Sequence, residues 1–216
     1  EAKMPEVVER YLRAVEANNP VGALIAYPGS PLLIAQAMRP QDRLAACELQ
    51  TDEADALKEL FAHDSRVAVH ARDGYTAIKA MLPPRTETLK FARGLVLIDP
   101  PYEVQDNEYP QIISTVREAL ERWPQATYAI WYPIKLRRSL QPFFRKAAAL
   151  PGKSVMLAEL QIRPDDSPLR LNGSGLVIVN PPWKFDQQIA PALLLLKKTL
   201  GEVGAMTRLE WLKTES

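Results

Sequence analysis

The chain has 216 residues, 47% hydrophobic and 25% charged, and its 27 basic side chains nearly balance 26 acidic ones, giving a formal net charge of +1. A chain of this length removes roughly 70% of its unfolded surface from water, so it can form a core without disulfides or a structural metal. One cysteine and two histidines exclude a four-ligand zinc protein, and the balanced charge excludes a purely electrostatic, histone-like binder. No apolar run approaches the roughly 18 residues of a membrane-spanning helix. We therefore expect one soluble domain over residues 1–216, in the reducing cytoplasm.

The predicted elements alternate between helices and strands. Apolar residues at helical spacing predict helices at 5–18 and 30–38, the second with Ser30 as its N-cap and Pro31 in its first turn. The pattern then predicts strands and helices in turn, with strands at 43–49, 66–71, 94–98 and 127–132 and helices at 51–61, 75–81, 109–123 and 136–150. Two last strands, at 155–162 and 175–179, have only a short polar segment between them, which predicts an antiparallel hairpin.

This order predicts an α/β fold of the Rossmann-like, doubly wound class, with a mostly parallel sheet and a C-terminal antiparallel hairpin. Ligands of such sheets bind at the carboxyl ends of the strands. Three acids, Glu48, Asp73 and Asp99, each follow a predicted strand. Together they would line a nucleotide-like crevice, whereas each one taken singly is equally typical of a cap on the following helix.

The strongest motif is Asp99-Pro100-Pro101-Tyr102, which directly follows the apolar strand 95–98. An aromatic amine such as adenine N6 is a poor nucleophile, because its lone pair is delocalised into the ring. It needs acceptors for its hydrogens, and the Asp99 carboxylate and the Pro100 carbonyl can serve as these acceptors. The two prolines stiffen the turn, and the Tyr102 ring offers a stacking face for a flipped base. The alternative is that Asp99, Pro100 and Pro101 only end the strand and take no part in chemistry.

A second motif, Asn180-Pro181-Pro182-Trp183, ends the last predicted strand. We expect Asn180 and Trp183 to bind the substrate, although a wall of the pocket or a structural turn is the alternative for Asn180. Trp131, Tyr132 and Trp183 are either a base-stacking surface or buried aromatic residues. A group of five basic residues could face nucleic acid or could be an ordinary solvated helix face: Lys135, Arg137, Arg138, Arg145 and Lys146.

The chain resembles the bacterial 23S ribosomal RNA adenine-N6 methyltransferase J family, whose members are class I S-adenosylmethionine-dependent methyltransferases and were earlier described as proteins for using external DNA as a nutrient. The resemblance rests on five segments in family order: 27–31 (Tyr-Pro-Gly-Ser-Pro), 73–74 (Asp-Gly), 95–103, 129–133 (Ala-Ile-Trp-Tyr-Pro) and 179–184 (Val-Asn-Pro-Pro-Trp-Lys).

The resemblance implies methylation of adenine N6 in 23S ribosomal RNA that is free of protein or at an early stage of assembly, by a reaction that needs no metal. The oligomeric state stays open, with a monomer favoured. It implies S-adenosylmethionine as the cofactor, and a role for each residue that matches the family pattern. Asp99 would be the catalytic acceptor, with Pro100, Tyr102, Asn180 and Trp183 at the substrate. Ser30, Glu48, Asp73 and Gly74 would bind the cofactor.

One part of the family pattern has no counterpart in this chain. The resemblance implies a histidine-rich and basic segment, then a first strand with a glycine-rich turn, whereas the nine glycines here are scattered. We expect this first strand to be missing from the chain, which starts with Glu1 rather than Met. Two alternatives stay open: a DNA adenine-N6 methyltransferase that uses the same site, and a catalytically silent nucleic-acid-binding protein.

Overall fold

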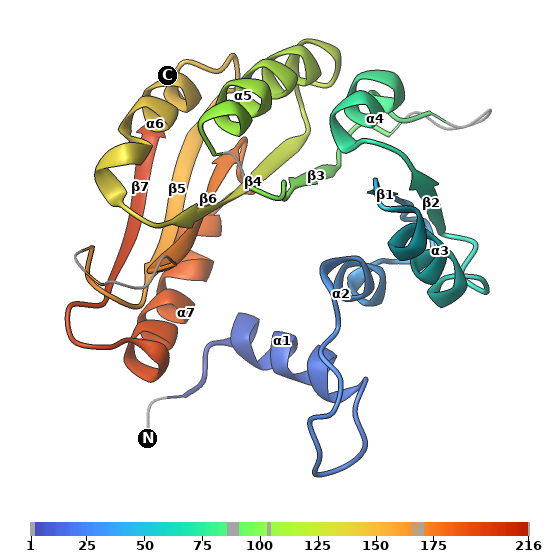
Figure 1. The fold of residues 1–216 in the computed structure, drawn as a ribbon, viewed down its shortest axis with the longest axis horizontal. Coiled ribbons are helices and arrows are strands. Elements are labelled where there is room, and N and C mark those ends of the chain that lie inside the picture. The colour runs from blue at the N-terminus through green and yellow to red at the C-terminus, as the bar shows by residue number, and fades with distance from the viewer. Residues whose placement is uncertain (1–2, 86–90, 103–104, 166, 168–170, 216) are drawn as a thin grey trace. The chain divides into compact units, whose positions relative to one another are not determined.

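The computed structural model of the protein describes residues 3–85, 91–102, 105–165, 167 and 171–215 (Figure 1). The chain forms two compact units, Glu1–Ala77 and Ile78–Ser216. The single domain over 1–216 therefore stays a prediction. No helix within the described ranges is both long and apolar enough to cross a membrane.

The first unit contains a parallel strand–helix–strand motif. Its elements are α1 (Glu6–Glu16), α2 (Ser30–Ala37), β1 (Leu44–Glu48), α3 (Thr51–Leu60), β2 (Val67–Ala71) and the start of α4 (Gly74–Met81). β1 and β2 pair in parallel, with Glu48 opposite Ala71. The crossover helix α3 has Asp52 and Glu53 in its first turn and Lys58 in its last turn, the charge order that a helix dipole favours. The predicted strands and helices of this unit are confirmed.

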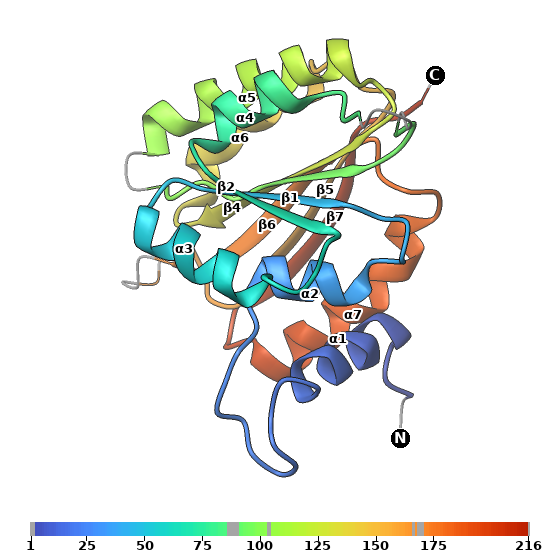
Figure 2. The same ribbon diagram turned by 90° about the vertical axis from the view of Figure 1, so that its right-hand side faces the viewer.

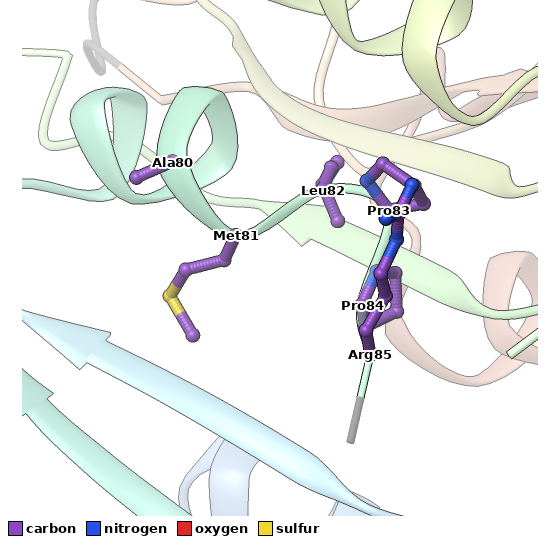
Figure 3. A pocket seen from close by; sticks show the side chains of 6 residues that line it. All are labelled: Ala80, Met81, Leu82, Pro83, Pro84 and Arg85. Atoms are coloured by element: carbon purple, nitrogen blue, oxygen red, sulfur yellow. The ribbon is translucent and has the colours of Figure 1, made fainter. Parts of the chain in front are cut away.

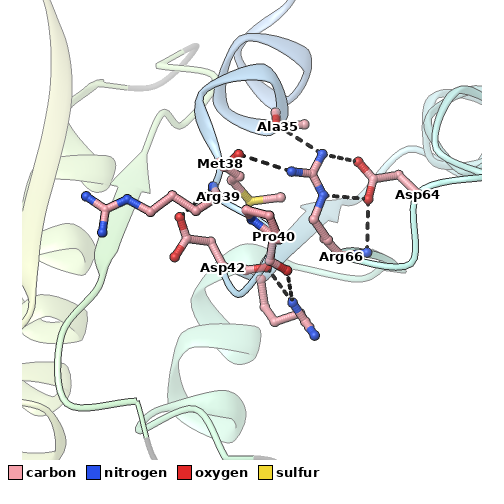
Figure 4. A network of polar contacts seen from close by, with 8 residues as sticks. Ala35, Met38, Arg39, Pro40, Asp42, Asp64 and Arg66 are labelled. Atoms are coloured by element: carbon pink, nitrogen blue, oxygen red, sulfur yellow. Dashed lines mark hydrogen bonds and ion pairs between the residues drawn. The ribbon is translucent and has the colours of Figure 1, made fainter.

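Arg66 fixes the C-terminal end of α2 at the start of β2 (Figure 4). Its guanidinium donates to the carbonyls of Met38, at 3.1 Å, and Ala35, at 3.4 Å, and forms an ion pair of 2.6 Å with Asp64. These bonds add a side-chain donor to carbonyls at the C-terminal end of the helix, where the Ala35 carbonyl also accepts from the N–H of Met38 at 3.3 Å. At the other end of α2 the N-cap is Gly29, and Ser30 is the first helical residue, so the prediction of Ser30 as N-cap was wrong by one position.

The second unit is built on a five-stranded mixed sheet. Its strands are β3 (Leu95–Ile98), β4 (Thr127–Ile134), β5 (Val155–Gln161), β6 (Gly173–Val179) and β7 (Met206–Lys213), in the order β3-β4-β6-β5-β7. Its helices are α5 (Gln105–Arg122), the short 3-10 helix η1 (Arg137–Leu140), α6 (Gln141–Ala148) and α7 (Phe185–Leu200). Figure 2 shows α5 and α6 on one face of this sheet and α7 on the other.

The strand pairing of the second unit agrees with part of the predicted topology. β3 and β4 are parallel, and β5 and β6 form the expected antiparallel pair. β6 also pairs antiparallel with β4, so it lies between two strands that precede it in the chain. With β5 and β7 antiparallel as well, the sheet of this unit is mixed, and the expectation of a mostly parallel sheet was wrong here. α7 and β7 were not predicted at all, and β7 extends the sheet beyond β5.

The core of the second unit lies between β4 and α6. Side chains alternate along a strand, and Tyr128, Ile130, Tyr132 and Ile134 are all fully buried. The ring of Tyr132 lies 5.6 Å from that of Phe143 and 5.5 Å from that of Phe144, both on α6. These residues therefore mark the face of β4 that packs against α6.

β3, which forms one edge of this sheet, is apolar. Among the strands that the structure describes, β3 pairs only with β4. Leu95 and Leu97 are 59% and 40% exposed. An apolar edge strand that exposes its side chains is unusual, because it can pair with another chain.

Candidate active site

Asp99 lies at the carboxyl end of β3, where the sequence predicted a ligand-binding edge. A residue before proline favours extended backbone conformations, so Asp99, which precedes Pro100, is expected to continue the direction of β3. The side chain is exposed, and partial desolvation nevertheless raises the pKa of its carboxyl above the ordinary value. A carboxylate that is less hydrated is a stronger acceptor for an amine hydrogen.

Tyr102 is held inside the second unit. Its backbone is left-handed, with φ of 49°, and the residue is only 4% exposed. Its hydroxyl donates a hydrogen bond to the carbonyl of Trp131, and its ring lies 5.5 Å from that of Tyr109 and 5.8 Å from that of Trp131. The predicted stacking of a base on Tyr102 would require this ring to become accessible.

Asn180 lies at the opposite end of the sheet from Asp99. Thr127, the first residue of β4, donates to the Asn180 carbonyl at 2.7 Å, whereas Asp99 follows Ile98, which pairs with Ile130. The two ends are separated by about 13 Å along the strands, at about 3.3 Å per residue. The structure therefore does not bring Asn180 to Asp99.

The hydrogen bonds of Asn180 are those of a structural turn. Its Nδ2 donates to the carbonyls of Pro124 and Ala126, both at 3.0 Å, and its Oδ1 accepts from the backbone N–H of Lys153 at 2.8 Å. No donor of the side chain is left for a substrate, which favours the turn that the sequence left open as an alternative.

Trp183 follows the same turn. It is 81% exposed, and the Nζ of Lys184 lies 4.1 Å from the centroid of its ring. Its place at the Asn180 end of the sheet separates it from Asp99, so it does not share a pocket with that residue. Its predicted contact with the target base has no support from this geometry.

Three of the four predicted cofactor residues meet at one edge of the first unit. Glu48 ends β1, Asp73 follows β2, and the two strands are parallel, so their carboxyl ends meet. Glu48 Oε1 accepts from the N–H of Gln50 at 2.9 Å, and Asp73 Oδ2 accepts from the N–H of Thr76 at 2.8 Å. Asp73 thus caps α4, yet both acids keep one oxygen without a hydrogen bond among the described residues.

Gly74 leaves room beside these acids. A Cβ built on it would meet no atom within 4 Å, so a ligand can approach its backbone closely. Ser30 is exposed at the first turn of α2, and within the described part of the chain no hydrogen bond joins its side chain to Glu48 or Asp73. These cofactor residues all lie in the first unit, whereas Asp99 lies in the second.

Arg137 is engaged inside the second unit. Its Nη2 donates to Gln161 Oε1 at 3.0 Å, and its Nη1 lies 3.2 Å from Oε2 of the fully buried Glu159. The Tyr132 hydroxyl donates to the other oxygen of Glu159 at 2.8 Å, and burial, reinforced by this carboxylate, holds the pKa of Tyr132 far above its ordinary value. Arg137 is therefore not free for RNA, and the exposed basic residues of the predicted group are Lys135, Arg138, Arg145 and Lys146.

An open cavity of about 510 Å³ lies in the second unit, at the end of α4 and the residues that follow it (Figure 3). It is lined by the six consecutive residues from Ala80 to Arg85, most of them apolar. None of the predicted site residues contributes to it, so it adds no catalytic group. In the part of the chain that the structure describes, no cluster of three His, Cys, Asp or Glu side chains could hold a metal ion.

Sequence and structure comparisons match nearly the whole chain. A family model described as "Ribosomal RNA large subunit methyltransferase D, RlmJ" matches residues 1–213. The chain is 36% identical over 214 residues to the ribosomal RNA large subunit methyltransferase J of Haemophilus influenzae, which covers 98% of this chain and 74% of that relative. It is 35% identical over 201 residues to the Escherichia coli K12 protein of the same name, over 93% of this chain and 70% of that relative.

A solved structure supports the same conclusion. The crystal structure of a Legionella pneumophila protein matches with a TM-score of 0.85 and 30% identity, over 96% of this chain and 75% of that one. This match confirms the predicted α/β fold, and the sequence matches confirm the family that the motifs indicated. The chain belongs to the ribosomal RNA large subunit methyltransferase J family.

Proposed function

We propose that this protein transfers a methyl group from S-adenosylmethionine to the N6 amine of an adenine in 23S ribosomal RNA. Family membership supports the reaction class. The observation that carries the chemistry is the position of Asp99, exposed at the carboxyl end of β3 and followed by Pro100 and Pro101.

Asp99 and the Pro100 carbonyl would hold the two hydrogens of the amine. This directs the nitrogen lone pair outward and places the amine for an in-line transfer. The cofactor, when bound, supplies a methyl group on a positively charged sulfur. As the new N–C bond forms and the S–C bond breaks, positive charge develops on N6, and the Asp99 carboxylate stabilises it and accepts the proton that N6 loses.

The first unit offers groups that fit this cofactor. The unpaired oxygens of Glu48 and Asp73 would accept hydrogen bonds from its hydroxyl and amine groups. The open space at Gly74 would admit its planar base against the backbone. The exposed Ser30 would add a hydroxyl from the first turn of α2.

The RNA would be contacted by exposed basic residues. Lys135 follows β4 at the same end of the sheet as Asp99, and Arg138 lies in the next turn, η1. Both are exposed and would bind phosphates. A target base must leave its stack to reach Asp99, so protein-free RNA with an accessible adenine would be the preferred form.

The test is methyl transfer by Asp99 variants of the full-length protein. We expect Asp99→Ala to abolish transfer from labelled S-adenosylmethionine to a protein-free 23S transcript, and Asp99→Asn to retain only traces, because the amide accepts a hydrogen bond but carries no charge. The melting temperature should stay unchanged, since the side chain is exposed. Activity should be lost in acid at a higher pH than an ordinary aspartate would give, because desolvation raises the pKa of Asp99.

Two outcomes would contradict the proposal. Near-normal turnover by Asp99→Ala on adenine-containing RNA would remove Asp99 from the chemistry. Equal methylation of single-stranded DNA of the same sequence would move the function to the DNA alternative, since an RNA enzyme that reads the 2′-hydroxyl or RNA shape discriminates between them.

A further inference from the structure

We propose that Arg137 is a positioning residue for the RNA: it anchors the connection between β4 and α6, so that Lys135 and Arg138 meet the phosphates in one preformed arrangement. This inference rests on the proposed function, in which Lys135 and Arg138 bind the RNA. It gives a role to the ion pair of Arg137 with the buried Glu159, which the methyl transfer itself does not use.

The geometry of η1 sends Arg137 inward and Arg138 outward. Side chains three residues apart eclipse each other in a 3-10 helix, so Arg137 shares its face with Leu140, which is only 1% exposed. Arg138 lies on another face of the same turn and is exposed. A rotation of η1 that released Arg137 would therefore also turn Arg138 away from its present direction.

Two side chains of β5 hold Arg137 in this inward position. Its Nη1 lies 3.2 Å from Glu159 Oε2, and its Nε and Nη2 donate to Gln161 Oε1 at 3.3 and 3.0 Å. Glu159 is fully buried, and removing one partner of a buried ion pair is strongly destabilising. Without Arg137 the nearest cation would be Arg208, whose Nη1 lies 3.8 Å from the same oxygen. The inward position of Arg137 is thus strongly favoured.

Asn172 anchors the other end of the connection. It is 1% exposed, and its Nδ2 donates to the Lys135 carbonyl at 2.9 Å. Its backbone N–H donates to the Ile134 carbonyl at 2.8 Å. The main chain is therefore fixed at Lys135 and again through Arg137, with only Leu136 between them.

Two anchors so close together preorganise the exposed basic pair. A loop that is ordered only on binding loses conformational freedom, which weakens the complex, whereas the main chain of Lys135 and Arg138 is already held. This connection follows β4 at the end where Asp99 follows the parallel strand β3. RNA bound by the pair would therefore lie at the end of the sheet that carries Asp99.

The experiment uses the full-length protein and a protein-free 23S transcript. We expect Arg137→Gln to raise the Kd and the KM for the transcript about 2- to 30-fold, the range for loss of two exposed ion pairs. The kcat at saturating transcript and the affinity for S-adenosylmethionine should stay unchanged. Arg137→Lys should restore part of the loss, because it keeps a charge beside Glu159 but lacks the planar fork that also reaches Gln161.

Asn172→Ala tests the second anchor without changing any charge. It removes the bond to the Lys135 carbonyl and should raise the Kd and the KM for the transcript in the same way. Arg208→Gln is the matched control, because it removes the other cation that faces Glu159 but has no contact with the connection. It should lower the melting temperature and leave the Kd for the transcript unchanged.

A protein that already carries Lys135→Ala and Arg138→Ala gives the sharpest comparison. If Arg137 acts through these two residues, Arg137→Gln should weaken transcript binding no further in that background. An additional loss there would overturn the inference, and so would an unchanged Kd in both Arg137→Gln and Asn172→Ala. If Arg137→Gln does not fold, an unchanged Kd in Asn172→Ala is sufficient to overturn it. Wild-type protein that binds the transcript with the expected pattern but transfers no methyl group would instead refute the proposed function alone.

Discussion

Replacing Asn180 with alanine separates a structural turn from a substrate contact. The change removes three side-chain hydrogen bonds, to the carbonyls of Pro124 and Ala126 and from the N–H of Lys153. It also puts alanine at a left-handed φ of 52°, which asparagine tolerates better than residues without a short polar side chain.

The magnitude follows from these contacts. Each hydrogen bond contributes about 1 kcal/mol net, and the left-handed conformation costs alanine about 1 kcal/mol. Because two of the three bonds are exposed, water replaces part of the loss, and we expect Asn180→Ala to lower the free energy of unfolding by about 2–4 kcal/mol. For a chain of this size that corresponds to a fall in melting temperature of roughly 5–15 °C.

The assay is thermal unfolding by calorimetry, paired with methyl transfer at a temperature well below the transition. Asn180→Gly is the control, because it loses the same bonds but accepts the left-handed backbone, and it should recover about 1 kcal/mol. Both variants should keep their affinity for RNA once folded. An unchanged melting temperature together with lost RNA affinity would refute the structural reading and return Asn180 to the substrate.

Three further outcomes are expected. Glu48→Ala should weaken S-adenosylmethionine binding by about 1–3 kcal/mol in calorimetry, and an unchanged affinity would mean that Glu48 only fixes the turn at Gln50. The Arg66 guanidinium, helped by the backbone N–H of the same residue, lowers the pKa of Asp64 from 3.8 to about 2, so the stability that this pair contributes is present above pH 4 and lost between about pH 4 and 2. Arg66→Gln keeps the backbone bond and should reduce that acid dependence in unfolding curves without abolishing it. Lys135→Ala with Arg138→Ala should lower RNA affinity and reduce the slope of its logarithm against log salt by about 2, with donor affinity unchanged.

The parts of the fold that the sequence predicted are those that local pattern determines. Apolar runs ending in an acid, such as the one before Asp99, marked β1, β2 and β3 correctly. The helix α7 escaped prediction because Pro191 interrupts it and its leucine run resembles any buried segment. β7 escaped because its apolar residues do not alternate regularly with polar ones.

The alternatives that the sequence left open at the site depend on strand pairing, which no local pattern reveals. Asn180 and Asp99 end similar apolar strands, but the antiparallel pairing of β6 with β4 carries them to opposite ends of the sheet. The basic residues were equally indistinguishable in the sequence, since only the fold shows that Arg137 faces a buried Glu159.

The place of β6 between β4 and β5 also sets the order in which the sheet of the second unit can be completed. β4 and β5 are synthesised first, and neither pairs with the other in the finished sheet. β4 can pair with β3 as soon as both are synthesised, but nothing joins β4 to β5 until residues 173–179 have left the ribosome. The contacts between β4 and β6 are therefore non-local and slow to form. Until then two strands rich in buried residues stand with open edges, the condition under which nascent chains join the wrong partner. Substitutions in β6 should accordingly lower the yield of soluble protein during synthesis, even where the free energy of unfolding of the folded protein changes little.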